Sequence, residues 1–220
     1  MKKKLLVLGL SFCMILFSNL SSFALQLNHE QQNENIITGV YNIDDSQSVI
    51  SEALTFEEIV EMIAVDNNIS LAEAEKQVIE SFNKNNNFLF NKSSISPYNA
   101  TYRTVSSSFT VTSEYKPSLK FYCQTSEGGY FWGIVKILNV GMDRNYKGLS
   151  KQFAGTVFTH LENAGRIFWI VNGDFFNNGT TTVNGGVEIK INESATINFG
   201  VSSSSNHYKY VYTQGYYNIR

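Results

Sequence analysis

The sequence predicts a mainly β protein: an antiparallel β-sandwich, or a closed barrel, of about eight strands preceded by a small helical hairpin. Apolar and polar residues alternate with period two over much of the chain beyond residue 101. Strand-like runs recur there about every ten residues, and the connections are too short for crossover helices, which demands antiparallel pairing. The two prolines, Pro97 and Pro117, both fall outside the predicted strands, as sheet hydrogen bonding requires.

Residues 1–24 have the three parts of a secretory signal peptide. Lysines occupy positions 2–4, an apolar run covers 5–20, and the small residues Ser22 and Ala24 precede a cleavage site. A transmembrane anchor is the alternative, but the run is shorter than the roughly 20 residues that span a bilayer. We therefore expect a secreted protein with no transmembrane segment after cleavage. Its remaining cysteine, Cys123, is expected to be a buried thiol rather than part of a disulfide.

Two capped amphipathic helices are predicted over 54–84, after a polar lead-in over 25–53 that lacks periodicity. Thr55 and Glu58 form one capping box, and Ser70 and Glu73 form a second. Apolar residues at helical spacing follow each box: Phe56, Ile59, Val60 and Ile63 in the first helix, then Leu71, Ala74, Val78 and Phe82 in the second. A linker over 85–100 separates this hairpin from a β domain over 101–220.

Charge divides the chain unevenly. Acids outnumber bases by twelve to three over residues 25–100, whereas bases outnumber acids by eleven to seven over 101–220. A helical pair that reads DNA needs clustered Lys and Arg to release counterions, and the bases here are scattered singly, so nucleic acid is excluded as a partner. The opposite charges favour a hairpin that docks on the β domain as a pro-segment or lid, through an attraction that salt would weaken.

The run over 167–171 organises the β domain. It is short, entirely apolar and ended by Asn172 and Gly173, which predicts a central strand covered on both faces. Before it we expect strands over 105–112, 119–123, 130–140 and 151–161, with a loop over 142–150. After it we expect strands over 187–192, 195–201 and 208–212, with the serines at 202–205 in a loop.

Aromatic residues near the C-terminus are the candidate binding surface. The candidates are His207, Tyr208, Tyr210, Tyr212, Tyr216 and Tyr217. Flat aromatic faces with a polar tip suit sugar rings or another protein. The alternative is that this sheet face packs against the helical hairpin.

Few residues support catalysis or metal binding. His160 and Glu162 lie on one side of a predicted strand and could serve as acid and base, but solvated strand faces commonly carry such pairs, so we predict no catalytic residue. Asp174 and Asn177 are the calcium candidates because hard oxygen donors gather in that bend, although ordinary turn chemistry explains the same residues. Transition-metal and phosphate-binding motifs do not occur, and no cofactor is expected.

Three segments carry a resemblance to a known family. The capped helical pair, Ile170-Val-Asn-Gly-Asp-Phe-Phe-Asn-Asn-Gly179 and Ser205-Asn-His-Tyr-Lys-Tyr210 resemble exported proteins of Gram-positive bacteria that are grouped as a family of unknown function. The resemblance implies export and no particular activity.

These observations favour a non-enzymatic extracellular or cell-surface module that binds a glycan or a protein. The alternative is a membrane-active, toxin-like or antimicrobial β protein, because the Ser/Thr alternation over 105–112 and 180–182 is typical of strands that line a pore. A second alternative is an extracellular hydrolase that uses His160 and Glu162.

Overall fold

The computed structural model describes residues 48–83, 96–183 and 186–219. All of them belong to one compact unit, Tyr41–Arg220. The predicted signal peptide, most of the predicted lead-in and most of the predicted linker lie outside the described residues. Within the described part, no helix combines the length and the apolar character needed to cross a membrane.

The helical pair forms where the capping residues predict it, as α1 (Phe56–Asn67) and α2 (Leu71–Asn83). The backbone N–H of Glu58 donates to Oγ1 of Thr55 at 3.3 Å, and the N–H of Thr55 donates to Oε2 of Glu58 at 2.8 Å. Both halves of the first capping box are therefore present. α1 ends at Asn68, whose φ of 53° puts it in the left-handed conformation that stops a helix.

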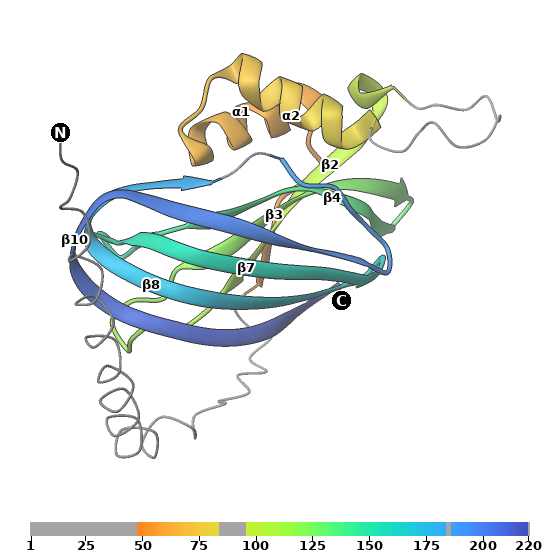
Figure 1. The fold of residues 1–220 in the computed structure, drawn as a ribbon. Coiled ribbons are helices and arrows are strands. Elements are labelled where there is room, and N and C mark those ends of the chain that lie inside the picture. Colours follow the sequence, from red (N-terminus) through yellow and green to blue (C-terminus); the bar gives the residue numbers. More distant parts are fainter. Residues whose placement is uncertain (1–47, 84–95, 184–185, 220) are drawn as a thin grey trace, which may run out of the picture. The chain divides into compact units, whose positions relative to one another are not determined.

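A five-stranded antiparallel sheet lies under these helices (Figure 1). In spatial order its strands are β1 (Ser48–Ile50), β2 (Thr101–Ser108), β3 (Ser118–Gly128), β4 (Phe131–Asp143) and β9 (Ile189–Lys190). The short η2 turn (Pro97–Asn99) leads into β2. β1 lies inside the segment predicted as a structureless lead-in, and it pairs with residues 105–107 of β2. Three residues are too few to show a period-two pattern, so the sequence gives no signal for this strand.

The second sheet contains β7 (Gln152–Asn163), β8 (Arg166–Val183) and β10 (Glu193–Asn218), all antiparallel. β10 is long enough to pair with β7 over residues 193–199 and with β8 over 199–218. Each of these three strands is therefore hydrogen-bonded to the other two. The two large sheets are not closed together into a barrel. The barrel alternative is therefore wrong for the described part of the chain.

Two segments expected to be loops are largely strand. β4 runs on to Asp143, and β5 (Asn145–Tyr146) and β6 (Leu149–Ser150) then form a small hairpin. The serines at 202–205 belong to β10, because the last residues of β8 continue as its pairing partner there. The pairing register shifts between residues 202 and 205, and Ser203 has a φ of 54°, so the chain bends without leaving the sheet.

One hydrophobic core is shared by the two sheets, and a second lies under the helices. Side chains that fill the first include Phe121, Cys123, Val157, Trp169 and Phe199. The second joins the apolar stripes of α1 and α2 to Tyr102, Tyr122 and Leu138 on the opposite face of the five-stranded sheet. Cys123 is fully buried, as predicted, and burial raises the pKa of its thiol, which keeps it protonated and inert.

A buried lysine fixes the end of α2 to the sheet. Nζ of Lys136, on β4, donates to the carbonyl oxygens of Ser81 at 3.2 Å and Phe82 at 2.7 Å, and to Oε1 of Glu188 at 3.3 Å. These carbonyls belong to the last turn of α2, where a positive charge complements the helix dipole.

Candidate functional site

The β7–β8–β10 sheet has an inner face in the shared core and an outer face away from it. In β8 the buried residues Ile167, Trp169 and Val171 alternate with Phe168 and Ile170, which are only partly buried. The run over 167–171 was predicted to be covered on both faces, and this prediction is wrong for one of them. An apolar residue at every position looks the same whether one face or both are covered, so the sequence could not separate the two cases.

A row of contacting rings crosses the outer face from β7 through β8 to β10. The rings of Phe158 and Phe168 are 6.2 Å apart in an edge-on arrangement, and those of Phe168 and Tyr216 are 4.9 Å apart. The guanidinium of Arg166 lies 4.1 Å from the centre of the Tyr216 ring, and its Nε is 3.1 Å from Oε2 of Glu162. We call these three rings and Arg166 the aromatic row. Phe168 thus contacts a ring on each side, and the Tyr216 ring packs between Phe168 and the guanidinium.

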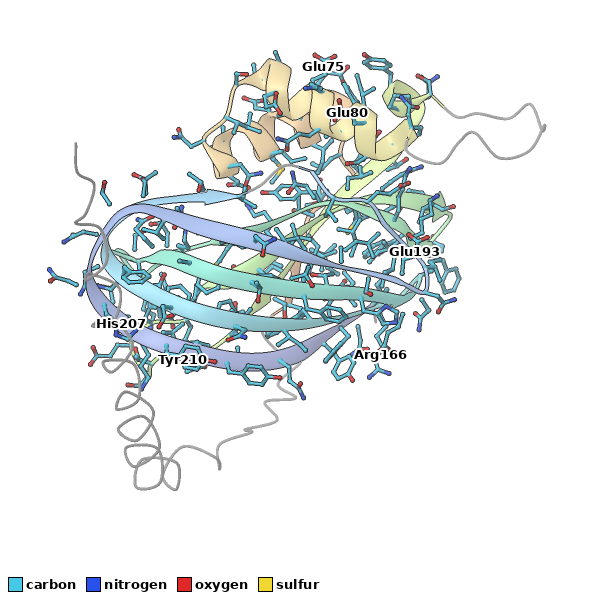
Figure 2. The ribbon with its side chains drawn as sticks, viewed as in Figure 1. Glu75, Glu80, Arg166, Glu193, His207 and Tyr210 are labelled. Carbon is cyan, nitrogen blue, oxygen red and sulfur yellow. The ribbon has the colours of Figure 1, made fainter. Side chains whose placement is uncertain are left out.

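A second group on the outer face is polar. Nε2 of His207 lies 2.8 Å from Oδ1 of Asp174, and the hydroxyl of Tyr210 donates to Oδ1 of Asn172 at 2.8 Å. We call these four residues the polar cluster. Figure 2 shows His207 and Tyr210 toward one end of the β7–β8–β10 sheet and Arg166 toward the other. The outer face thus offers a row of aromatic rings at one end and oriented hydrogen-bonding groups at the other.

The six predicted aromatic residues divide between the two faces. Tyr210, Tyr212 and Tyr216 are exposed, at 52%, 60% and 39% respectively, and point outward together with His207. Tyr217 is completely buried in the shared core. Tyr208 packs edge-on against Tyr115, at 6.0 Å, and its hydroxyl is 3.1 Å from Oγ1 of Thr112.

A bulge in β10 explains why Tyr208 and Tyr210 separate. Simple alternation predicts that Tyr208, Tyr210 and Tyr212 share a face and that His207 lies on the other. The register shifts between His207 and Lys209, so β10 gains one residue relative to β8. His207 and Tyr210 consequently share the outer face although they are three positions apart.

The sequence did not point to the other outer-face residues. Phe168 belongs to the run predicted to be covered on both faces, Asn172 was predicted to end that strand as a turn former, and Phe158 was not singled out. In the structure Asn172 lies inside β8, opposite Tyr212. One feature of the sequence could have indicated this surface: Glu162 and Arg166 are four residues apart on either side of the predicted turn. The salt bridge between them places Arg166 at an exposed end of β8.

The predicted acid–base pair is not brought together. Nδ1 of His160 lies 2.9 Å from the carbonyl oxygen of Glu193, whereas the carboxylate of Glu162 contacts Arg166. The two side chains are both on the outer face, but each has its own partner.

The calcium candidates are likewise engaged with different partners. Asp174 contacts His207, and Oδ1 of Asn177 accepts from Nζ of Lys151 at 2.7 Å. Among the described residues no group of three or more His, Cys, Asp or Glu side chains is placed to hold a metal ion. Ser107, part of the Ser/Thr alternation behind the pore hypothesis, is buried, and its Oγ accepts from Nε1 of Trp169 at 3.2 Å.

Comparison with known proteins adds no assignment. No protein-family model, curated protein or solved structure matches the chain. Function must therefore be argued from the chemistry of the outer face itself.

Proposed function

We propose that this chain is an exported, non-enzymatic binding module and that its outer face binds a carbohydrate chain. The observation that supports the proposal is the combination, on one sheet face, of exposed aromatic rings and oriented hydrogen-bonding groups. A sugar ring presents an apolar C–H face and a rim of hydroxyls, so a site that recognises it needs both kinds of group.

The chemistry of the outer face favours a carbohydrate over a protein partner. The core of a protein interface is apolar and poor in charged groups. Here the apolar side chains Phe158, Phe168 and Ile170 are only partly exposed, and the most exposed rings are tyrosines with polar tips. Asp174 and His207 lie on the same face, toward its other end, which suits a ligand rich in hydroxyl groups.

The fold that carries this face is proposed to be a β-sandwich. The shared core, filled from both large sheets, supports a face-to-face stack of the kind that places sheets about 10 Å apart. An experimental structure in which the two sheets do not stack in this way would contradict the arrangement.

Binding to polysaccharides tests the function. The purified full chain is run in native gels that contain soluble polysaccharides and is incubated with insoluble ones, of bacterial, plant and animal origin. The variant Tyr210→Ala/Tyr212→Ala/Tyr216→Ala removes the exposed rings, and we expect its affinity to fall at least about tenfold, which corresponds to about 1.4 kcal/mol.

The matched control is Tyr130→Ala. Tyr130 is fully exposed in the turn between β3 and β4 of the other sheet and is not part of the outer face, so its removal should leave binding unchanged. If the triple variant binds as well as the native chain, the outer face is not the site. If no polysaccharide is retained and a protein ligand is captured through the same tyrosines, the carbohydrate proposal is wrong and the protein alternative replaces it.

A further inference from the structure

A pocket of about 270 Å³ lies away from the outer face, among the end of α1, the segment that follows β4 and the far part of β8. Its polar lining includes Asn67, Arg144, Gln152, Thr180 and Thr181. Met142, Val183 and Phe199 supply an apolar wall. The pocket is thus polar on one side and apolar on the other, which is typical of sites for small organic ligands.

Arg144 is the positive charge of this pocket, and part of its guanidinium is unused. Nη1 donates to Oε1 of Gln152 at 2.5 Å. Within the residues that the structure describes, Nε and Nη2 have no protein partner, and no carboxylate forms a salt bridge with the group. Burial lowers the pKa of Arg144, and the nearby Tyr115 and Asp143 oppose this shift only in part, so the charge is partly removed from water without a salt-bridge partner. A charge in this position gains from an anion that can reach it.

Arg103 shows how the Nε and Nη2 edge of a guanidinium binds when it has a partner. Its Nε and Nη2 donate to the two carboxylate oxygens of Glu127, each at 3.0 Å. This forked pairing matches the planar geometry of a carboxylate. In Arg144 the equivalent edge is the unpaired one. The comparison within one chain therefore points to a carboxylate as the missing partner.

Two further observations fit an incoming carboxylate. Nδ2 of Asn67, a residue of the lining, is buried and has no hydrogen-bond partner among the described residues, so an unsatisfied donor lies beside the pocket. The one acid of the lining, Asp66, is already neutralised, because Nζ of Lys120 and the hydroxyl of Tyr122 each lie 2.6 Å from its Oδ2. Repulsion of an anion by Asp66 is reduced accordingly.

We propose that this pocket binds a small organic carboxylate, with its two oxygens on Nε and Nη2 of Arg144 and its apolar body against Met142 and Phe199. The volume is sufficient, since an apolar cavity of about 150 Å³ accommodates a benzene ring. The site is separate from the carbohydrate face, so either proposal can fail without the other.

Benzoate and benzamide form a matched pair of probes. They share the ring and nearly the same shape, but only benzoate carries the charge that the forked edge of Arg144 recognises. Each is titrated into the ¹⁵N-labelled full chain, and the resonances of the Arg144 Nε–H and the Asn67 side-chain amide are followed by NMR. We expect saturable shifts with benzoate and at least about tenfold weaker binding of benzamide.

Variants assign the effect to the pocket. Arg144→Gln should weaken benzoate binding at least about tenfold, and Arg144→Lys should weaken it less, because it keeps the charge and loses only the fork. The control is Lys147→Gln, which removes one charge from the exposed turn between β5 and β6 and should leave binding unchanged. Thermal unfolding without ligand checks that each variant is folded. Should Arg144→Gln fail to fold, Thr180→Glu, which places a negative charge in the lining, should also abolish binding.

Three results would overturn the proposal. The first is the absence of saturable shifts up to about 50 mM benzoate, because a pocket of this kind should bind more tightly than that. The second is equal binding of benzamide and benzoate. The third is benzoate binding that survives Arg144→Gln. Sulfate is titrated in parallel. Equal competition by sulfate would show that the site takes any oxyanion and that the apolar wall contributes nothing.

Discussion

The two large sheets each have a face turned away from the shared core, and these faces are built differently. On the five-stranded sheet, Tyr102, Tyr122 and Leu138 are fully buried by the helices. On the β7–β8–β10 sheet, Tyr210 and Tyr212 remain more than half exposed. Both faces are rich in aromatic residues, so aromatic content alone does not distinguish a covered face from a binding face.

The partners of the tyrosine hydroxyls do distinguish them. On the covered face the hydroxyl of Tyr122 donates to Asp66 on α1, and that of Tyr102 donates to the carbonyl of Pro97 at 2.6 Å. Both bonds connect separate layers or segments of the fold. On the outer face the hydroxyl of Tyr210 donates to Asn172 within the same sheet. The covered face therefore uses its polar atoms for internal attachment, whereas the outer face leaves its groups accessible to a ligand.

The largest difference should appear when a ring is removed from each face. Tyr122→Ala leaves a cavity under the helices and removes a donor from Asp66, so we expect it to lower the free energy of unfolding by about 3–5 kcal/mol. Tyr212→Ala should change it by less than about 0.5 kcal/mol. Urea denaturation of both variants measures the contrast. Similar losses would mean that the outer face is also covered in solution.

A smaller effect is expected where β7 and β8 approach each other closely. A Cβ atom at Gly173 would lie 2.3 Å from the carbonyl oxygen of Ala154, so Gly173→Ala must displace one strand. We expect a loss of about 1–3 kcal/mol in the free energy of unfolding. Gly128→Ala is the control, because its Cβ would meet nothing closer than 4.0 Å, and it should be neutral or slightly stabilising. Denaturation that shows equal stability for both variants would contradict the close packing of these strands.

Alkaline pH should act on the covered face. Burial raises the pKa of Tyr102 and of Tyr122 above the usual value, and for Tyr122 the nearby Asp66 contributes as well. The folded state keeps these protons where the unfolded chain loses them. The stabilisation is therefore complete below about pH 10 and is lost progressively as the pH rises further. Unfolding free energies measured from pH 8 to 11 should decline less steeply for Tyr102→Phe than for the native chain, and parallel slopes would refute this origin.

The smallest predicted effect concerns the start of α1. Thr55→Ala removes the side-chain acceptor for the N–H of Glu58 and should reduce the free energy of unfolding by about 1 kcal/mol. Thr196→Ala, at an exposed position of β10, removes a similar side chain without a cap and should cost less than about 0.5 kcal/mol. Thermal unfolding followed by circular dichroism compares the two. Equal stability would show that the helices contribute little beyond their apolar stripes.

The sequence predicted those parts of the fold that depend on local pattern. Thr55 and Glu58 mark the start of a helix by their own side-chain chemistry, and the structure confirms the helical pair. The alternation around Phe121 and Cys123 likewise gave the correct buried face. These features depend on residues a few positions apart, so they can be recognised without knowledge of the tertiary structure.

The parts that failed depend on distant partners. Nothing near Tyr208 shows that β10 bulges against β8, and this bulge decides which aromatic residues face outward. The serines at 202–205 are strand because the end of β8 pairs with them, although serines of this kind are typical of loops. Arg144 was not considered as a site residue, because its unpaired edge is visible only once Gln152 and Asn67 are placed beside it.

The burial of Tyr102, Tyr122 and Leu138 changes how the acidic helical pair should be understood. A detachable lid held by opposite charges would come away in concentrated salt, whereas salt strengthens contacts between apolar surfaces. The pair also receives the Lys136 ammonium at the end of α2. Expression of residues 101–220 by themselves should therefore yield an insoluble product. A protease that cuts between α2 and β2 should leave two fragments that stay together until a denaturant separates them.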